Sequence, residues 1–391
     1  MDNQPPPEEA ATAPPRRISF LRRWLGWWGG SPGGEPLSQA QADVPPPPPV
    51  LTAKAPTGRN AELAAAYAKK PEEPVAEPPT DIPLPAPPAW KVLEPEDQSD
   101  PVPHEVSIFS PRNESWNLLA ASVRGKLHAH QAMWRDDAFA LDSLGDWTIL
   151  AVADGAGSAK ISRIGAQIAC EEAIKSLKGS LPGSPLAPGE PDTPAQETLL
   201  QLRSCLADAA RHAQAGIAQE AERRSLPVRE FSTTFLLVIH APYQDRDFVG
   251  AIQVGDGAIG LCTADQACTV LGVPDHGAYS SETVFLTAPG IEQQFERRVF
   301  FAVKKGLRCL AIMSDGVADD FFPENRRLVE LFSGKPIADL KDRQGNPVVG
   351  VMHSVVTEPR DGKALLEWLQ YERKGSSDDR TLVLMYRSNG A

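Results

Sequence analysis

Proline divides this chain into two unlike parts. Of its 38 prolines, 24 lie in the first 103 residues, including the uninterrupted run from Pro45 to Pro49. Proline lacks a backbone N–H and fixes its own φ, so such a segment cannot form ladders of hydrogen bonds and has little apolar surface to bury. We therefore predict that residues 1–103 form a disordered, partly polyproline-II tail and that residues 104–391 form the folded domain.

One segment of this tail differs from its surroundings. Residues 16–30, RRISFLRRWLGWWGG, interleave arginines with a phenylalanine and three tryptophans. This pattern favours a short amphipathic docking element, either for a membrane surface or for a groove on a partner protein. The alternative is a segment that packs against its own domain.

Charge and cysteine content narrow the classes of partner and compartment. The formal net charge of -12 makes nucleic acid an unsuitable general partner. The five cysteines form no C-x-x-C pair, which favours plain buried thiols in a reducing compartment over a disulfide framework or a zinc ribbon. The acidic, proline-rich start of the chain is unlike a secretory signal, and no stretch is apolar for the roughly 18 residues that a membrane helix needs. We expect a cytoplasmic protein.

The apolar pattern after residue 103 predicts an α+β fold. Helical spacing predicts long helices near 160–178 and 195–224 and shorter helices near 324–333 and 361–373. Apolar runs bounded by turn residues predict strands in AFAL, DWTILAVADG, FSTTFLLVIHA, FVGAIQVGDGAIGLCT, CTVLGV, ETVFLTA, LRCLAIMSDG and SSDDRTLVLMYR. Strands and helices are grouped rather than alternating, so we expect a sandwich of two sheets covered by helix pairs.

Aspartates stand where these apolar strands begin or end. The set is Asp136, Asp137, Asp154, Asp256, Asp315, Asp378 and Asp379. A single Asp-Gly pair is usually a turn. If the strand ends converge, however, unpaired carboxylates repel one another, and a divalent cation relieves the repulsion. Oxygen donors without thiolate ligands indicate Mg²⁺ or Mn²⁺, and two such ions about 4 Å apart can activate a water for attack on phosphorus.

The order of these motifs resembles that of a known family. RDDAF, VADGAGS, STTF, VGDGAIG, ETVFLT, MSDGVADDF and SSDDRTLVLM follow one another as in the PP2C (PPM) family of metal-dependent protein serine/threonine phosphatases. The resemblance covers about residues 104–390 and is strongest to a bacterial branch with DGAGSA and GxxH elements. It implies a four-layer α-β-β-α sandwich, two antiparallel sheets flanked by helix pairs. It also implies hydrolysis of phosphoserine and phosphothreonine by direct attack of water activated at a centre of two Mn²⁺ or Mg²⁺ ions.

The resemblance assigns metal-binding roles to individual residues. Asp154 matches the aspartate that bridges both metals, and the Gly155 carbonyl matches the backbone ligand beside it. Asp315 and Asp378 match the other carboxylates on the first metal. Asp136 stands where many members have the glutamate that holds the second metal, and Asp137 matches the aspartate that follows it and supports it. Asp379 occupies a metal-site position that is often asparagine, and Asp256 matches a residue of a third, weaker metal site.

The chain departs from the family where the phosphate is bound. Ala132 stands where many members have a phosphate-gripping arginine, and Ala156 stands where some have a histidine that acts as general acid. The basic residues nearby are Arg124, His128, His130 and Arg135, and residues 125–128 fit the GxxH element. We expect His128 to lie near the phosphate as a catalytic residue beside Asp154. The general acid would be metal-bound water, His128 or His276.

Two classes of function remain open at this point. The first is an active phosphatase acting on phosphoproteins, with a cognate serine/threonine kinase and with a flap at residues 272–287 that shapes access to the site. The second is a pseudophosphatase that binds phosphoproteins as a regulatory module, which the missing arginine and the long tail would suit. Every core carboxylate is present, and clustered charge without a metal is destabilising, so the first reading is preferred.

Overall fold

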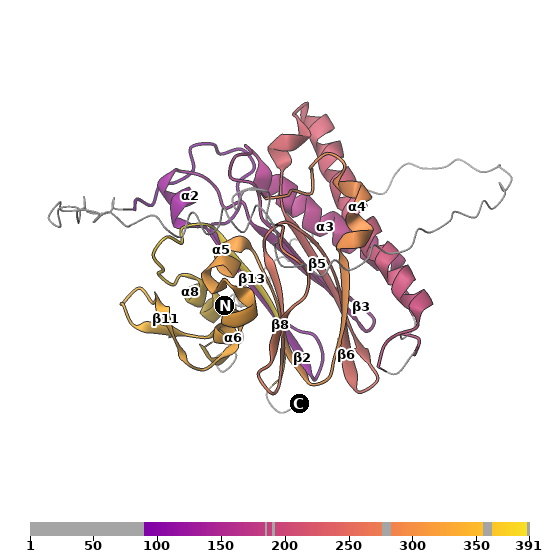
Figure 1. The fold of residues 1–391 in the computed structure, drawn as a ribbon. Coiled ribbons are helices and arrows are strands. Elements are labelled where there is room, and N and C mark those ends of the chain that lie inside the picture. The colour runs from indigo at the N-terminus through magenta and orange to yellow at the C-terminus, as the bar shows by residue number, and fades with distance from the viewer. Residues whose placement is uncertain (1–89, 184–185, 190–191, 276–282, 355–361, 389–391) are drawn as a thin grey trace, which may run out of the picture. The chain divides into compact units, whose positions relative to one another are not determined.

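Two antiparallel sheets lie at the centre of the fold, with helices on both outer faces (Figure 1). The computed structural model describes residues 90–183, 186–189, 192–275, 283–354 and 362–388. The expected docking segment at residues 16–30 and most of the expected tail lie outside the described residues.

The strands have the following bounds: β1 (Glu105–Pro111), β2 (Trp116–Val123), β3 (Ala138–Leu144), β4 (Trp147–Ala153), β5 (Phe235–Tyr243), β6 (Arg246–Val254), β7 (Ala258–Thr263), β8 (Cys268–Val270), β9 (Val299–Lys304), β10 (Leu307–Met313), β11 (Pro336–Lys341), β12 (Pro347–Val349) and β13 (Arg380–Arg387). The helices are α2 (Lys126–His130), α3 (Ser162–Ser180), α4 (Gln196–Arg224), α5 (Asp315–Ala318), α6 (Glu324–Phe332), α7 (Val351–Ser354) and α8 (Lys363–Leu369). The 3₁₀ helices are η1 (Val228–Phe231), η2 (Ile291–Gln293), η3 (Phe295–Arg298) and η4 (Asp319–Phe321).

Strand pairing produces two layers. One sheet has the order β1-β2-β13-β10-β7-β8, the other has the order β3-β4-β5-β6-β9, and β11 and β12 form a separate hairpin. Every pairing is antiparallel. Because antiparallel neighbours run in opposite directions, the end of one strand lies beside the start of the next.

The residues of β4 show why helices cover the sheets. Ile149 and Ala151 pack in the cluster that includes α3 and α4, whereas Leu150 and Val152 face the second sheet. Alternate residues of a strand point to opposite faces, so a strand that is apolar at every position must be buried on both. A third cluster joins the outer face of the six-stranded sheet to α6, α7 and α8. The expected four-layer α-β-β-α sandwich is therefore confirmed.

Most of the predicted elements are present, but one strand was predicted wrongly. The long helices α3 and α4 match the predicted ranges, and α8 is shorter than predicted. The described part of ETVFLTA, residues 283–288, forms no strand. The backbone of residues 283–288 instead passes the residues just before β5, where the Leu286 N–H donates to the Thr233 carbonyl at 2.8 Å. The chain then turns at Pro289. β-Branched and aromatic residues suit a strand, but this tertiary contact prevails.

The cysteines also differ from expectation. Cys262 on β7 and Cys268 on β8 form a disulfide, with their Cα atoms 4.3 Å apart. Their spacing of six residues carries no motif, and only the pairing of the two strands places them opposite each other. The expectation of plain thiols was wrong for this pair. It holds for Cys170, Cys205 and Cys309, which are free and buried.

The segment before β1 lies against the folded part. The Leu93 N–H donates to the Ala129 carbonyl at 2.9 Å, and the Trp134 ring N–H donates to the Asp97 carbonyl at 2.6 Å. Asp100 pairs with Arg224 at the end of α4. The tail boundary at residue 103 stays a prediction, and these contacts favour one nearer residue 90. Within the described ranges, no helix has the length and apolar character to cross a membrane.

Candidate metal centre

Strand register brings the expected carboxylates to one end of the sandwich. Ala138 of β3 pairs with Ala153 of β4, so Asp137 just before β3 lies beside Asp154 just after β4. In the other sheet, Met313 at the end of β10 pairs with Ala258 on one side and Leu382 on the other. Asp315 therefore lies between the turn that carries Asp256 and the loop that carries Asp378 and Asp379.

Hydrogen bonds join the two sheets at this end. Asp137 belongs to the five-stranded sheet, and its Oδ2 accepts from Ser314 Oγ at 2.8 Å and from Thr381 Oγ1 at 2.6 Å, both on the other sheet. The Asp136 N–H donates to Asp379 Oδ2 at 2.6 Å. These bonds fix the spacing of the carboxylates before any ligand arrives.

Two glycines allow the loops of the site to approach closely. A β-carbon on Gly125 would overlap the backbone of Asp378 and Asp379, and one on Gly316 would overlap the Asp379 carbonyl. Gly155, the expected carbonyl ligand, also lies close to its neighbours, since a β-carbon there would come within 2.9 Å of the Asp136 carbonyl oxygen. Glycine is required at these positions because backbone packs directly on backbone.

Burial and mutual repulsion raise the pKa values of these carboxyls. Burial raises the pKa of Asp315 to about 8, and the charges of Asp378 and Asp256 add to the rise. Burial raises the pKa of Asp136 to about 7 and, with the charge of Asp379, that of Asp137 to about 6. The pKa of Asp154 lies well above its ordinary value because of burial and the charge of Asp315. Such a cluster disfavours its own ionised form.

The oxygen atoms at the carboxylate end of the sandwich suit a hard divalent cation. Buried carboxylate oxygens without a hydrogen-bond partner among the described residues are Asp136 Oδ2, Asp137 Oδ1, Asp256 Oδ1 and Asp315 Oδ1. An unpaired buried carboxylate oxygen is costly, and a cation relieves this cost and the repulsion together. The donors are oxygens, as Mg²⁺ and Mn²⁺ prefer. In addition, His128, Asp378 and Asp379 each offer a ligand atom within 4.8 Å of the others.

His128 on α2 lies inside this cluster. Its Nδ1 is 2.9 Å from Asp379 Oδ2, and its Nε2 is 4.0 Å from Asp136 Oδ2. Burial disfavours the charged ring, but the hydrogen bond to Asp379 and the surrounding carboxylates outweigh it and raise the pKa of His128 to about 9. The ring is therefore protonated at neutral pH in the absence of a metal.

The other two basic candidates have different surroundings. Arg135 is buried, and its guanidinium donates to Ser122 Oγ at 2.6 Å and to backbone carbonyls of Pro103 and Asp137. Arg124 is only partly buried and donates to the Met133 carbonyl at 3.2 Å. Its remaining N–H groups make no bond among the described residues. The contacts of Arg135 support the fold, whereas Arg124 keeps donors for a ligand.

The turn that carries Asp256 is attached to the expected flap. Thr283 Oγ1 donates to Asp256 Oδ2 at 2.6 Å. Asp275 accepts from the Gly255 N–H at 2.9 Å and pairs with Arg298. Residues 276–282 of the flap, His276 among them, lie outside the described residues.

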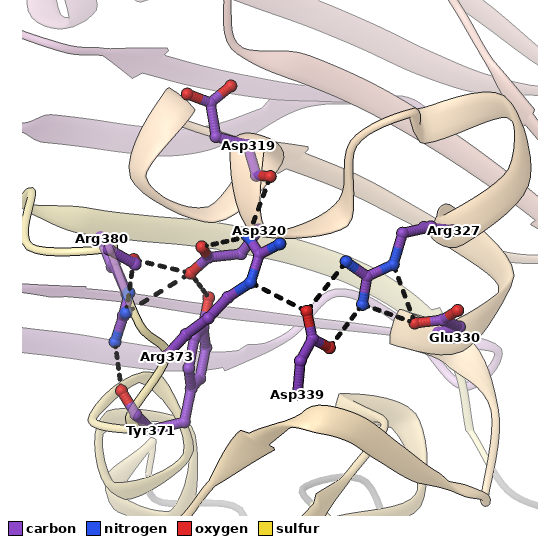
Figure 2. Close-up of polar contacts among 9 residues, drawn as sticks. Asp319, Asp320, Arg327, Glu330, Asp339, Tyr371, Arg373 and Arg380 are labelled. Carbon is purple, nitrogen blue, oxygen red and sulfur yellow. Dashed lines mark hydrogen bonds and ion pairs between the residues drawn. The ribbon is translucent and has the colours of Figure 1, made fainter. Parts of the chain in front are cut away.

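A second network, absent from the sequence prediction, holds the loop of Asp378. Asp320 of η4 accepts from Tyr371 Oη at 2.7 Å, from Ser376 Oγ at 2.8 Å and from Arg373 at 2.7 Å. Arg380 lies 3.4 Å from the same carboxylate and stacks over the Tyr371 ring (Figure 2). Asp320 lies in the MSDGVADDF motif, but nothing in the sequence shows that its carboxylate contacts four residues between positions 371 and 380.

Comparison with known proteins decides the family. Residues 124–369, more than half of the chain, match the family model described as protein phosphatase 2C. This chain belongs to the protein phosphatase 2C family. By family it is a protein serine/threonine phosphatase, as the motif order predicted.

The individual phosphatases to which this chain is similar share less than a third of its residues over the aligned region. The chain is 29% identical over 208 residues to serine/threonine-protein phosphatase 3 of Escherichia coli K12, an alignment that covers 52% of this chain and 74% of that protein. The catalytic domain of the phosphatase PstP, solved with two manganese ions, is 16% identical and has a TM-score of 0.41, covering 70% of this chain and 99% of that one. PppA of Pseudomonas aeruginosa is also 16% identical with a TM-score of 0.41, covering 70% and 97%.

Proposed function

We propose that this chain hydrolyses phosphoserine and phosphothreonine in protein substrates, with two divalent cations, Mn²⁺ or Mg²⁺, held at the strand-end carboxylates. The observation that carries the proposal is the set of buried, unpaired carboxylate oxygens at one end of the sandwich. Asp136 just before β3 and Asp315 just after β10 supply two of these groups, from the ends of opposite sheets. A catalytically inert module would gain nothing from keeping so many repelling charges together.

The family resemblance and the geometry suggest how the ligands divide. One ion would be held by Asp154, Asp315 and Asp378, and a second by Asp154 and Asp136, with the Gly155 carbonyl as a further ligand beside Asp154. Asp256 would serve a third, weaker site. When bound, the ions supply Lewis acidity and a water of lowered pKa for attack on phosphorus.

The remaining site residues orient the ligands and the substrate. Asp137 accepts from Thr381, and Asp379 accepts from the Asp136 N–H and donates its own N–H to Asp378 Oδ1. We therefore assign Asp137 and Asp379 to holding Asp136 and Asp378 in place. His128 keeps a proton at Nδ1 for Asp379 and directs Nε2 towards Asp136. We assign phosphate binding to Arg124, because it has free donors, rather than to Arg135.

Hydrolysis of p-nitrophenyl phosphate tests this function. We expect turnover with Mn²⁺, none with EDTA, and at least about a 100-fold loss in Asp154→Ala and Asp315→Ala, since the metal supplies several kcal/mol of transition-state stabilisation. Asp142→Ala is the matched control, because Asp142 is a partly exposed β3 aspartate paired with Lys178. Absence of Mn²⁺-dependent turnover in the unaltered chain would favour the pseudophosphatase.

The class of substrate protein follows from this proposal. The substrate would be a protein phosphorylated by a cognate serine/threonine kinase, with the flap at residues 272–287 shaping its access. Deleting residues 275–280 should reduce activity on phosphoproteins more than on p-nitrophenyl phosphate, and equal losses would contradict a flap role. A cytoplasmic location and docking through residues 16–30 stay predictions.

A further inference from the structure

Two cavities lie on either side of the loop at residues 376–378, and they differ in charge. The first, of about 320 Å³, is lined by four aspartates with Arg373 and Lys374, so negative charge is in excess. The second, of about 100 Å³, is lined by Arg124, Lys126, Arg343 and Arg380 against Glu372 and Asp378. We call this second space the basic cavity. Both cavities include Asp378, one of the proposed metal ligands.

The four cations of the basic cavity are not equally available. Arg380 donates to the Leu369 and Tyr371 carbonyls and to Ser376 Oγ, and Lys126 pairs with Glu372. The Arg124 guanidinium makes one hydrogen bond, to the Met133 carbonyl. Arg343, on the turn between β11 and β12, is exposed and has no hydrogen bond or ion pair with any described residue. Two guanidinium groups therefore keep donors for a ligand.

The walls of the basic cavity are held in place. The loop from Tyr371 to Asp378 is fixed by the Asp320 network of Figure 2. The hairpin that carries Arg343 is joined to this loop by two backbone bonds between Lys341 and Glu372, at 3.0 and 2.6 Å. The Arg124 N–H is fixed to the His104 carbonyl at 2.8 Å. A rigid site loses little conformational entropy when it binds.

We propose that the basic cavity binds an anionic side chain that flanks the phosphoresidue under attack in the substrate. This rests on the proposed function, because it places the scissile phosphate at the neighbouring carboxylate end. Guanidinium groups present paired donors that match the oxygens of a carboxylate or a phosphate. The cavity meets the metal centre at Asp378, so a peptide whose phosphate lies at that centre and beside Arg124 can place a neighbouring side chain beside Arg343. The chain would then select phosphopeptides with acidic flanks.

Equilibrium binding and hydrolysis, measured separately, test the basic cavity. The binding probes are fluorescent peptides in which a non-hydrolysable phosphonate replaces the phosphoresidue, flanked by glutamate, glutamine, lysine or a second phosphonate. Anisotropy with Mn²⁺ present is measured for the unaltered chain, for Arg343→Glu and for Arg326→Glu. Arg326 is the matched control, since it is exposed on α6 and does not line the basic cavity.

We expect the unaltered chain and Arg326→Glu to bind the glutamate peptide about tenfold more tightly than the glutamine peptide. Arg343→Glu should lose this preference and favour the lysine peptide, a reversal that a loss of folding would not produce. Tighter binding of the second phosphonate than of glutamate would identify a phosphorylated flank. Equal affinity of the unaltered chain for all flanks would overturn the proposal. If the unaltered chain prefers the glutamate peptide but does not hydrolyse the matching phosphopeptides, the proposed role of the basic cavity holds and the proposed phosphatase activity is rejected.

Discussion

His128 and Asp379 share a hydrogen bond of 2.9 Å between Nδ1 and Oδ2 in the buried end of the sandwich. The same Asp379 oxygen accepts from the Asp136 N–H at 2.6 Å. One carboxylate oxygen thus joins α2, the start of β3 and the start of β13. Partners that orient metal ligands in this way are as important to metal affinity as the ligands' own placement.

His128→Gln tests this orienting role. Loss of the Nδ1 hydrogen bond should lower Mn²⁺ affinity and kcat about 10–100-fold while the fold is retained. Titration calorimetry measures the affinity. His130 of the same helix is partly exposed and contacts Lys91 and Trp90. His130→Gln should therefore leave both quantities within about twofold of the unaltered chain. Unchanged Mn²⁺ affinity in His128→Gln would contradict the role.

Asp320→Asn tests the network that holds the loop of Asp378. Asp320 is 3% exposed and pairs with Arg373 and Arg380, so removing its charge should lower the free energy of unfolding by about 3–5 kcal/mol. Mn²⁺ affinity should fall with it, because Ser376 and Arg380 flank the metal-site aspartates. Urea unfolding and calorimetry measure the two effects.

Asp339→Asn is the control for that experiment. Asp339 also pairs with Arg373, and with Arg327, but it is 42% exposed (Figure 2). Solvent screens such a pair, so its loss should cost at most about 1 kcal/mol. Equal destabilisation by the two substitutions would show that the buried position of Asp320 is not decisive.

Gly316→Ala tests the close approach of backbones at the site. The added β-carbon would overlap the Asp379 carbonyl oxygen, so the loop must shift, at a cost of about 1–3 kcal/mol and with at least about a tenfold loss of kcat/KM. Gly179→Ala in α3 has open space around its β-carbon and should stabilise the chain by about 0.5–1 kcal/mol. A fully active Gly316→Ala would reject the steric argument.

The metal-free protein should lose stability as the pH rises. The folded-state pKa values of Asp137, Asp136 and Asp315 are raised to about 6, 7 and 8, so the folded chain binds more protons than the unfolded chain over this range. His128, with a pKa of about 9, adds stability below its ordinary pKa that is lost as pH rises through 9. Both effects have the same sign. Melting temperatures in EDTA should fall from about pH 5.5 to about pH 8.5, and a rise would contradict the clustering of charge.

The sequence was sufficient to place these carboxylates at the ends of strands, because the end of a strand is a local feature of the sequence. An apolar run followed by Asp-Gly, as at Asp154 and Asp315, predicts both the strand and the residue at its end. Antiparallel pairing then brings the ends together, as the pairing of Ala138 with Ala153 does for Asp137 and Asp154.

Features that depend on long-range contacts were missed. The Asp320 network unites residues 51–60 positions apart, and the Cys262–Cys268 disulfide depends on the pairing of β7 with β8. The strands β11 and β12 are short and each begins with proline, and the buried residues of β11, Ile337 and Leu340, are three positions apart rather than two, so the strand pattern is weak. Residues 283–288 have strand-forming composition, yet a contact with Thr233 decides their course.

Counting the metal ions bound by the purified chain tests the central claim most directly. The carboxylates of Asp136, Asp154 and Asp315 should bind about two Mn²⁺ per chain, measured by calorimetry and by elemental analysis after gel filtration. Asp154→Asn should lose both ions, because the proposed ligand assignment has them share its carboxylate, while remaining folded by circular dichroism. Absence of bound Mn²⁺ in the unaltered chain, or the same stoichiometry in Asp154→Asn, would contradict the account.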